Sequence, residues 1–126
     1  MGEYGFFAAQ LRFVAARTTS EAPELKAMMA ELGAMADCVE TTGQISVTAD
    51  KLRLAGRALA GVAGFLQQHI LPEAVAAGNA RGEAQIRWVI DTSMEFMAKL
   101  TVHAEQSQDG GDLTLDLPPP PELSES

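Results

Sequence analysis

The sequence has few residues suited to metal or nucleophilic chemistry: one cysteine, Cys38, and two histidines, His69 and His103. A single cysteine excludes an intramolecular disulfide, and nothing favours an oxidising compartment. Neither histidine has a second histidine three or four residues away, and Pro72 interrupts the helical spacing between His69 and Glu73. Cys38 has no neighbouring histidine or base to activate its thiol. We therefore expect no catalytic residue, no metal site and no cofactor.

Long apolar runs and a basic N-terminal segment are also missing. The best apolar run, residues 58–66, is far shorter than the roughly 20 residues that span a bilayer. No basic residue precedes Arg12, so the beginning of the chain lacks the pattern of a signal peptide. These two observations favour a cytoplasmic protein with no membrane span. The chain also has no glycine-rich phosphate loop after a strand and no G-x-S-x-G motif, so we do not expect an enzyme.

Basic charge is scarce: 9 Lys and Arg residues stand against 17 Asp and Glu residues, a net charge of −8. Residues 44–106 are balanced, whereas residues 107–126 carry five acids and no base. Electrostatic binding to nucleic acid is therefore not expected. Because most of the acidity lies in the last segment, a folded mimic of nucleic acid is also disfavoured.

The composition favours helix and a single domain. Hydrophobic residues make up 47% of the 126 residues, and the excess is alanine, a strong helix former. We predict an all-α fold: a four-helix bundle-like domain over residues 1–106 and a flexible, acidic, proline-rich C-terminal tail over residues 107–126. Short loops predict that sequential helices are antiparallel neighbours.

The longest stretch with a helical pattern is residues 46–71, which we interpret as a central helix. Its apolar residues recur at spacings of three and four, so they share one face. Residues 45–48 could be a few extended residues or the lead into this helix, for which Ser46 or Thr48 is a candidate N-cap. Pro72 predicts an end or a kink near Leu71. The other predicted helices span residues 4–17, about 23–39 and 80–106, with Gly43 as a left-handed cap after the second. The inner face predicted for the last helix consists of Ile86, Val89, Ile90, Met94, Met97, Leu100 and Thr101.

The central helix has a second apolar stripe beside its inner face. Four helices would not fully cover two stripes, so we predict a homodimer in which this stripe mediates self-association. A helix crossing closely at the stripe would make a Gly61→Leu substitution disruptive. The stripe consists of Leu54, Ala58, Gly61 and Phe65.

The tail carries a candidate partner-binding segment. Three leucines alternate with polar residues, which places them on one side of an extended strand, and prolines follow them. Such a segment can add to a sheet edge or lie in a groove, fold back on the basic residues of the body, or remain an inert solubilising tail. We expect the tail to add few groups to the core, so that its deletion, or serine at all three leucines, leaves the body stable. The candidate residues are Leu113, Leu115, Leu117, Pro118 and Pro119.

With no catalytic or ligand signature, the sequence favours a non-catalytic protein–protein interaction module: an adaptor, assembly factor or chaperone for another protein. An acidic inhibitor of a nucleic-acid-handling complex is the alternative, and a helical bundle that holds a small ligand is the third interpretation. The inhibitor needs a negative patch on the body, whereas the interaction module needs an exposed apolar one.

Overall fold

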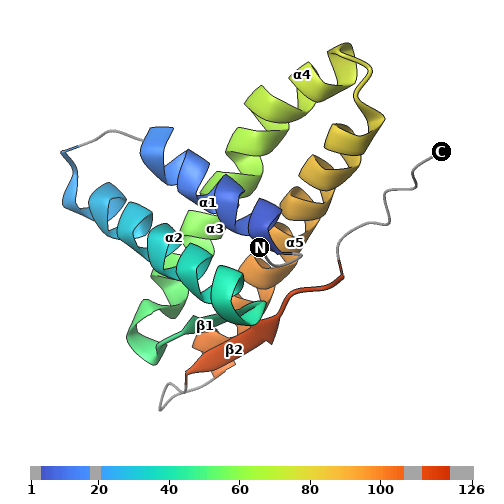
Figure 1. Ribbon diagram of the computed structural model, residues 1–126. Helices are drawn as coiled ribbons and strands as arrows, with labels where there is room; N and C mark the ends of the chain where they lie inside the picture. The colour runs from blue at the N-terminus through green and yellow to red at the C-terminus, as the bar shows by residue number, and fades with distance from the viewer. Residues whose placement is uncertain (1–3, 18–20, 107–111, 120–126) are drawn as a thin grey trace.

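The computed structural model describes residues 4–17, 21–106 and 112–119. It confirms an all-α domain with four principal helices (Figure 1). These are α1 (Gly5–Arg17), α2 (Pro23–Thr42), α3 (Leu52–Phe65) and α5 (Ala80–Gln106). The shorter elements are β1 (Gln44–Val47), η1 (Ala49–Lys51), η2 (Leu66–Ile70), α4 (Leu71–Ala76) and β2 (Leu113–Asp116).

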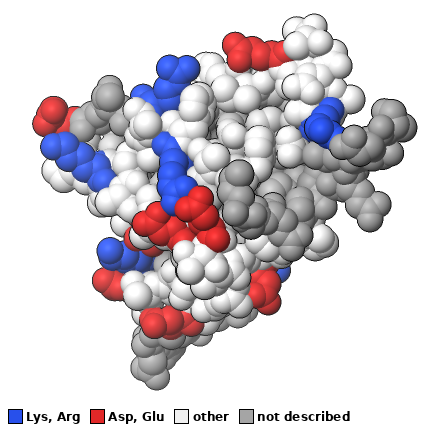
Figure 2. All heavy atoms as spheres, viewed as in Figure 1, with Lys and Arg blue, Asp and Glu red and all other residues white. Residues whose placement is uncertain are grey.

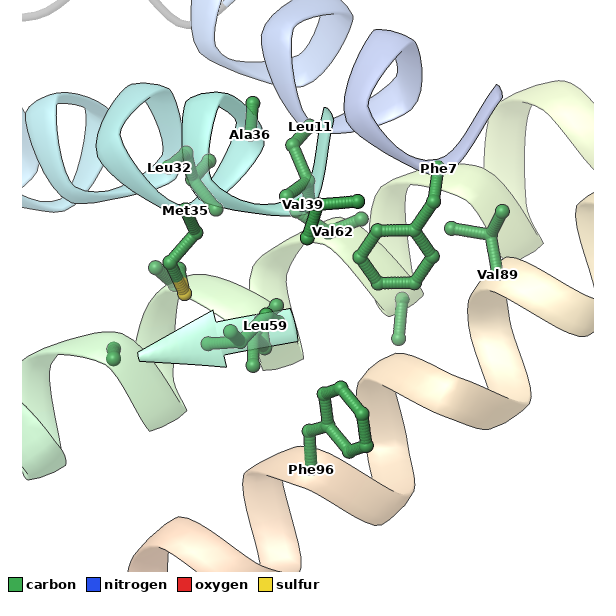
Figure 3. Close-up of a cluster of buried hydrophobic side chains, with 14 of the residues drawn as sticks. Phe7, Leu11, Leu32, Met35, Ala36, Val39, Leu59, Val62, Val89 and Phe96 are labelled. Atoms are coloured by element: carbon green, nitrogen blue, oxygen red, sulfur yellow. The ribbon is translucent and has the colours of Figure 1, made fainter. Parts of the chain in front are cut away.

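The core lies where α1, α2, α3 and α5 meet. Helix α3 packs mainly against α5, and α2 packs against both α1 and α3. Phe7 from α1 and Phe96 from α5 point toward one another in this core, with Leu59 of α3 beside them (Figure 3). All three side chains are almost fully buried. Phe7 also packs edge-on against Trp88 of α5, with the ring centroids 5.6 Å apart, so the first and last principal helices are in contact.

Gly43 ends α2 and turns the chain toward β1. Its φ of 74° is left-handed, and its N–H donates to the carbonyl of Val39 at 2.8 Å. The predicted glycine cap is thus confirmed. A Cβ at this position would lie 2.7 Å from Cε2 of Tyr4, so a larger residue would also collide with the start of α1.

The central helix begins later than its sequence pattern suggested. Residues 44–47 form β1, which pairs antiparallel with β2, and helical structure starts with η1. Ile45 and Val47 are buried and Ser46 between them is exposed, the alternation of a strand. Thr48 directs its hydroxyl to the carboxylate of Asp50 at 2.7 Å and makes no side-chain cap hydrogen bond. The extended alternative for residues 45–48 is thus the one found for Ile45 to Val47, where pairing with a distant segment stabilises the strand.

The central helix contains a wider, π-helical turn just before Pro72. Residues 66–70 form a π-turn, closed by a bond from the N–H of Leu71 to the carbonyl of Leu66. Pro72 has no N–H to donate to the preceding turn, and a wider turn relieves the clash between its ring and the backbone. The helix continues as α4 and stops before Gly78, whose φ is 70°. The widened turn agrees with the distortion predicted near Leu71.

The inner face of α5 differs from the prediction in the middle of the helix. Ile86, Val89 and Leu100 are buried as expected, but Met94 is 45% exposed. Ser93 and Phe96 occupy the core instead, with 0% and 1% exposure. The buried positions advance in alternating steps of three and four residues, and Met94 lies one residue after the buried Ser93.

None of the helices among the described residues has the length and apolar character needed to cross a bilayer.

Candidate functional site

An apolar hollow of about 390 Å³ lies between the C-terminal half of α5 and β2. We call it the α5–β2 hollow. Val102 in its wall is 50% exposed, and Met94, two turns earlier on α5, is 45% exposed. With Val75, these are the three large apolar side chains that stand exposed in the described part of the chain. The residues lining the hollow are Ala98, Lys99, Val102, His103, Gln106, Leu113 and Leu115.

The α5 side of the site follows from helix periodicity. Met94, Ala98 and Val102 are four residues apart, so they form one exposed strip along α5. An ion pair between Glu95 and Lys99, at 3.0 Å, borders this strip. Assigning Met94 to the inner face hid the strip in the sequence, although the spacing of the three residues was already visible.

The other side of the site is built by β2. Leu115 pairs with Ile45, and Leu113 pairs with Val47, so both leucines lie on the face that covers the body. Leu113 and Leu115 are half-buried, Leu117 is 5% exposed, and Thr114 between them is exposed. The predicted placement of the leucines on one side of an extended strand is confirmed.

Polar contacts fix both ends of β2. The amide of Gln44 donates to Asp116 at 2.6 Å, and the backbone N–H of Ala49 donates to Asp112 at 3.1 Å. The N–H of Leu117 donates to the carbonyl of Gly43 at 3.1 Å. These contacts anchor the segment at the loops that flank β1.

The five predicted partner-binding residues therefore have different environments. Leu113 and Leu115 line the hollow, whereas Leu117 belongs to the core. Pro118 is half-buried and Pro119 is exposed. The expectation that the tail adds few groups to the core is wrong for Leu117, because residues 112–119 run along the body. Residues 107–111 and 120–126 of the predicted tail lie outside the described residues.

The predicted self-association stripe is partly covered within the chain. Ala58 is 1% exposed and Leu54 is half-buried. Phe65 packs edge-on against Phe13 of α1, with the ring centroids 6.0 Å apart. Gly61 is exposed, and a Cβ added there would meet nothing within 4 Å. No helix of the described chain therefore crosses closely at Gly61.

The close helix crossing occurs at Gly56. A Cβ there would lie 3.6 Å from the hydroxyl oxygen of Thr101 and 3.8 Å from the carbonyl oxygen of Met97, both on α5. The absence of a side chain at Gly56 thus lets α3 pack closely against α5. This contact lies about one and a half helical turns before Gly61, the position tested in the sequence prediction.

Acidic and basic side chains on the body are paired rather than segregated. Arg12 of α1 contacts Asp37 at 2.6 Å and Glu40 at 3.1 Å, both on α2. These hydrogen bonds, first to Glu40 and then to Asp37, raise the pKa of Arg12 above its ordinary value. On α5, Glu83 pairs with Arg87 at 2.9 Å. Figure 2 shows the same mixture, with acidic and basic groups side by side on the face in view.

His69 and Cys38, two of the residues considered as metal ligands or nucleophiles, lie in different environments of the described chain. His69 packs 5.0 Å from the ring of Phe65, in a separate hollow that Arg17 and Glu73 also line. Cys38 is half-buried, with its sulfur 3.7 Å from the hydroxyl of Thr42. In the described part of the chain, no group of three or more His, Cys, Asp or Glu residues is arranged to hold a metal ion.

Comparison with known proteins adds no relative. No protein-family model, curated protein or solved structure matches the chain. The candidate site is therefore defined by its own geometry: an exposed apolar strip on α5 beside a strand contributed by the C-terminal segment.

Proposed function

We propose that the protein is a protein–protein interaction module whose partner binds at the α5–β2 hollow. The observation that supports this proposal is that the exposed Val102 lines the hollow together with the half-buried Leu113 and Leu115, while the exposed Met94 extends the same strip along α5. Apolar surface left in water costs about 25 cal/mol per Å², so covering this strip favours association. Exposed apolar patches commonly mark surfaces that bind other proteins.

The shape of the strip favours a protein partner over a small ligand. From Met94 to Val102 the strip extends about 12 Å along α5, given a rise of 1.5 Å per residue. Part of it therefore lies beyond the residues that line the hollow. A partner segment can follow the whole strip, whereas a small ligand would fill the hollow and leave Met94 uncovered.

The paired charges of the body weigh against the acidic-inhibitor alternative. Such an inhibitor needs a continuous negative surface, but Arg12, Arg87 and Lys99 each lie against carboxylates. Self-association through Leu54, Ala58, Gly61 and Phe65 stays a prediction, as does a cytoplasmic location.

Affinity capture from the native cell with matched variants tests the proposal. Val102→Asp places a charge in the hollow, whereas Val75→Asp changes a residue of equal exposure, 50%, on α4. We expect a discrete bound protein to be lost with Val102→Asp and retained with Val75→Asp, while both variants keep the melting temperature of the wild type. Equal recovery of that protein with both variants would contradict the proposal.

A further inference from the structure

The edge of β2 that faces away from β1 indicates which kind of partner segment could bind. Building on the proposed function, we propose that the partner contributes an extended segment that pairs with this edge as a third strand. In that arrangement, alternate residues of the segment are apolar and fill the α5–β2 hollow. The residues between them are lysine or arginine and face the carboxylates of β2.

The hydrogen-bond phase of the sheet shows which backbone groups point outward. The N–H of Leu117 bonds to the carbonyl of Gly43, so the pairs Leu117–Gly43 and Leu115–Ile45 are the hydrogen-bonded ones. In an antiparallel ladder these pairs alternate with pairs whose backbone groups point away from the partner strand. The N–H and C=O groups of Thr114 therefore point away from β1.

The cross-strand side chains agree with this phase. The hydroxyl of Thr114 lies 3.3 Å from that of Ser46, and Gln44 reaches Asp116 at 2.6 Å. Side chains of pairs without backbone hydrogen bonds lie closer together, as these do. Within the described residues the sheet has two strands, so β2 has no strand on its other side. The backbone groups of Thr114 and Asp116 are thus placed to accept a further strand.

A third strand at this edge would also cover the apolar surface. Neighbouring strands lie about 4.8 Å apart, and side chains alternate between the two faces. Every second side chain of the added strand would share the face of Leu113 and Leu115, which is the face toward the hollow. Those side chains would lie over Ala98 and Val102 of α5. Apolar residues at alternate positions satisfy this geometry.

The charges on the opposite face favour a basic partner over a second copy of this chain. Asp116 of β2 and Asp112, the residue just before this strand, are exposed, and the alternation along the segment places both on the face opposite the leucines. Two copies of β2 paired antiparallel about Thr114 would place Asp112 of each copy opposite Asp116 of the other. Like charges directly opposite one another destabilise a pair of strands, whereas opposite charges stabilise it. Lysine or arginine at these positions of the partner would replace repulsion with attraction.

Three synthetic peptides of about eight residues, a usual strand length, test the proposal on the full chain. One alternates lysine and leucine, and a second alternates glutamate and leucine. The third contains the lysines and leucines of the first in the order of an amphipathic helix, because residue order alone then selects strand or helix. Binding is followed by NMR, and the exchange of each backbone amide is compared with and without peptide.

We expect the alternating lysine peptide to bind about tenfold more tightly than the other two, since charge matching and strand pattern both favour it. Its binding should slow exchange of the Thr114 and Asp116 amides and leave those of Leu113 and Leu115 unchanged. Thr114→Pro should abolish binding because it removes an outward N–H while sparing the pairing with β1. Thr114→Ala is the control that keeps the N–H. Asp116→Lys should reverse the preference toward the glutamate peptide.

Tighter binding of the helical peptide, binding without protection of Thr114 and Asp116, or no binding of any peptide would overturn the strand proposal. A different result would contradict the proposed function: recovery of the cellular partner that is unchanged by Val102→Asp. Loss of capture with Val102→Asp, together with no protection at β2, would retain the interaction surface and reject the added strand.

Discussion

Leu115 lies directly opposite Ile45 in the two-stranded sheet, which joins the C-terminal segment to the chain just before the central helix. The two strands lie together at one end of the helical body, so this pair holds the C-terminal segment against that end (Figure 1). It also positions the half-buried side chain of Leu115 as one wall of the α5–β2 hollow. Stability of this segment and the shape of the candidate site therefore depend on the same residues.

Leu117 should contribute more to stability than any exposed residue of its segment. It is 5% exposed, and its truncation to alanine should lower the free energy of unfolding by about 2–4 kcal/mol, typical for buried leucines. The exposed Thr114 is the matched control, and Thr114→Ala should change stability by less than about 1 kcal/mol. Urea denaturation followed by circular dichroism measures both.

The same reasoning revises the expectation for the leucines as a group. Serine at Leu113, Leu115 and Leu117 together should lower the melting temperature, because one of the three is in the core. A melting temperature unchanged by Leu117→Ala would show that residues 112–119 do not pack against the body in solution.

The two glycines of α3 should respond differently to a large side chain. Gly56→Leu should cost about 1–3 kcal/mol, because it forces bulk into the contact with α5. Gly61→Leu should be neutral or stabilising by up to about 1 kcal/mol, since leucine favours helix and the position is open within the chain. Thermal unfolding at several micromolar concentrations checks both variants.

The Gly61 result also bears on the predicted homodimer. A loss of stability in Gly61→Leu, accompanied by a fall from dimer to monomer in light scattering, would show that a second copy crosses at this stripe. A monomeric wild type with an unaffected Gly61→Leu variant would exclude that interface.

The buried hydroxyl of Ser93 should make the folded protein less stable than it would be with alanine at this position. Its side chain is fully buried, and its oxygen has no hydrogen-bond partner within the described structure. Burying an unpaired hydroxyl costs about 1–3 kcal/mol, so Ser93→Ala should raise the melting temperature. Thr101→Val is the control of opposite sign, because the Thr101 hydroxyl donates to the carbonyl of Met97 at 2.9 Å. A lower melting temperature for Ser93→Ala would mean that the hydroxyl has a partner in solution.

The link between α1 and α2 should be sensitive to salt. Arg12→Met removes the contacts with Asp37 and Glu40, so the melting temperature should fall at low ionic strength. The difference from the wild type should shrink at high salt, because exposed charges are screened. Lys26→Met, which removes the single ion pair of Lys26 found among the described residues, with Glu21, should have the smaller effect. A salt-independent loss would assign the role of Arg12 to packing of its side-chain stem.

The sequence was informative about the helices because their signals are local. Gly43 predicted a left-handed cap, Pro72 predicted the distortion of the central helix, and the bounds of the last helix agree with the structure. These features depend on residues within a few positions of one another. Local preference was sufficient for them because tertiary packing reinforces it.

The strand pairing could not be found in the same way, whereas the phase of α5 was misassigned. Residues 45–48 were open to an extended or a helical interpretation, and the choice between them depends on the pairing of Ile45 and Val47 with Leu115 and Leu113, which local patterns cannot reveal. Met94 could have been assigned correctly from the alternating three- and four-residue spacing of the buried positions. The candidate site combines both features, so only its leucines were identified from sequence, and its α5 side was missed.

Site-specific photo-crosslinking in the native cell tests the central claim most directly. A photoreactive amino acid is placed at Val102, in the α5–β2 hollow, or at Val75, which is equally exposed at 50% on α4. A partner that binds at the hollow predicts a discrete covalent adduct from position 102 and none from position 75. The adduct should disappear when Ala98→Asp is added beside the crosslinker. Adducts of equal yield from both positions, or none from position 102, would contradict the claim that this hollow is the partner surface.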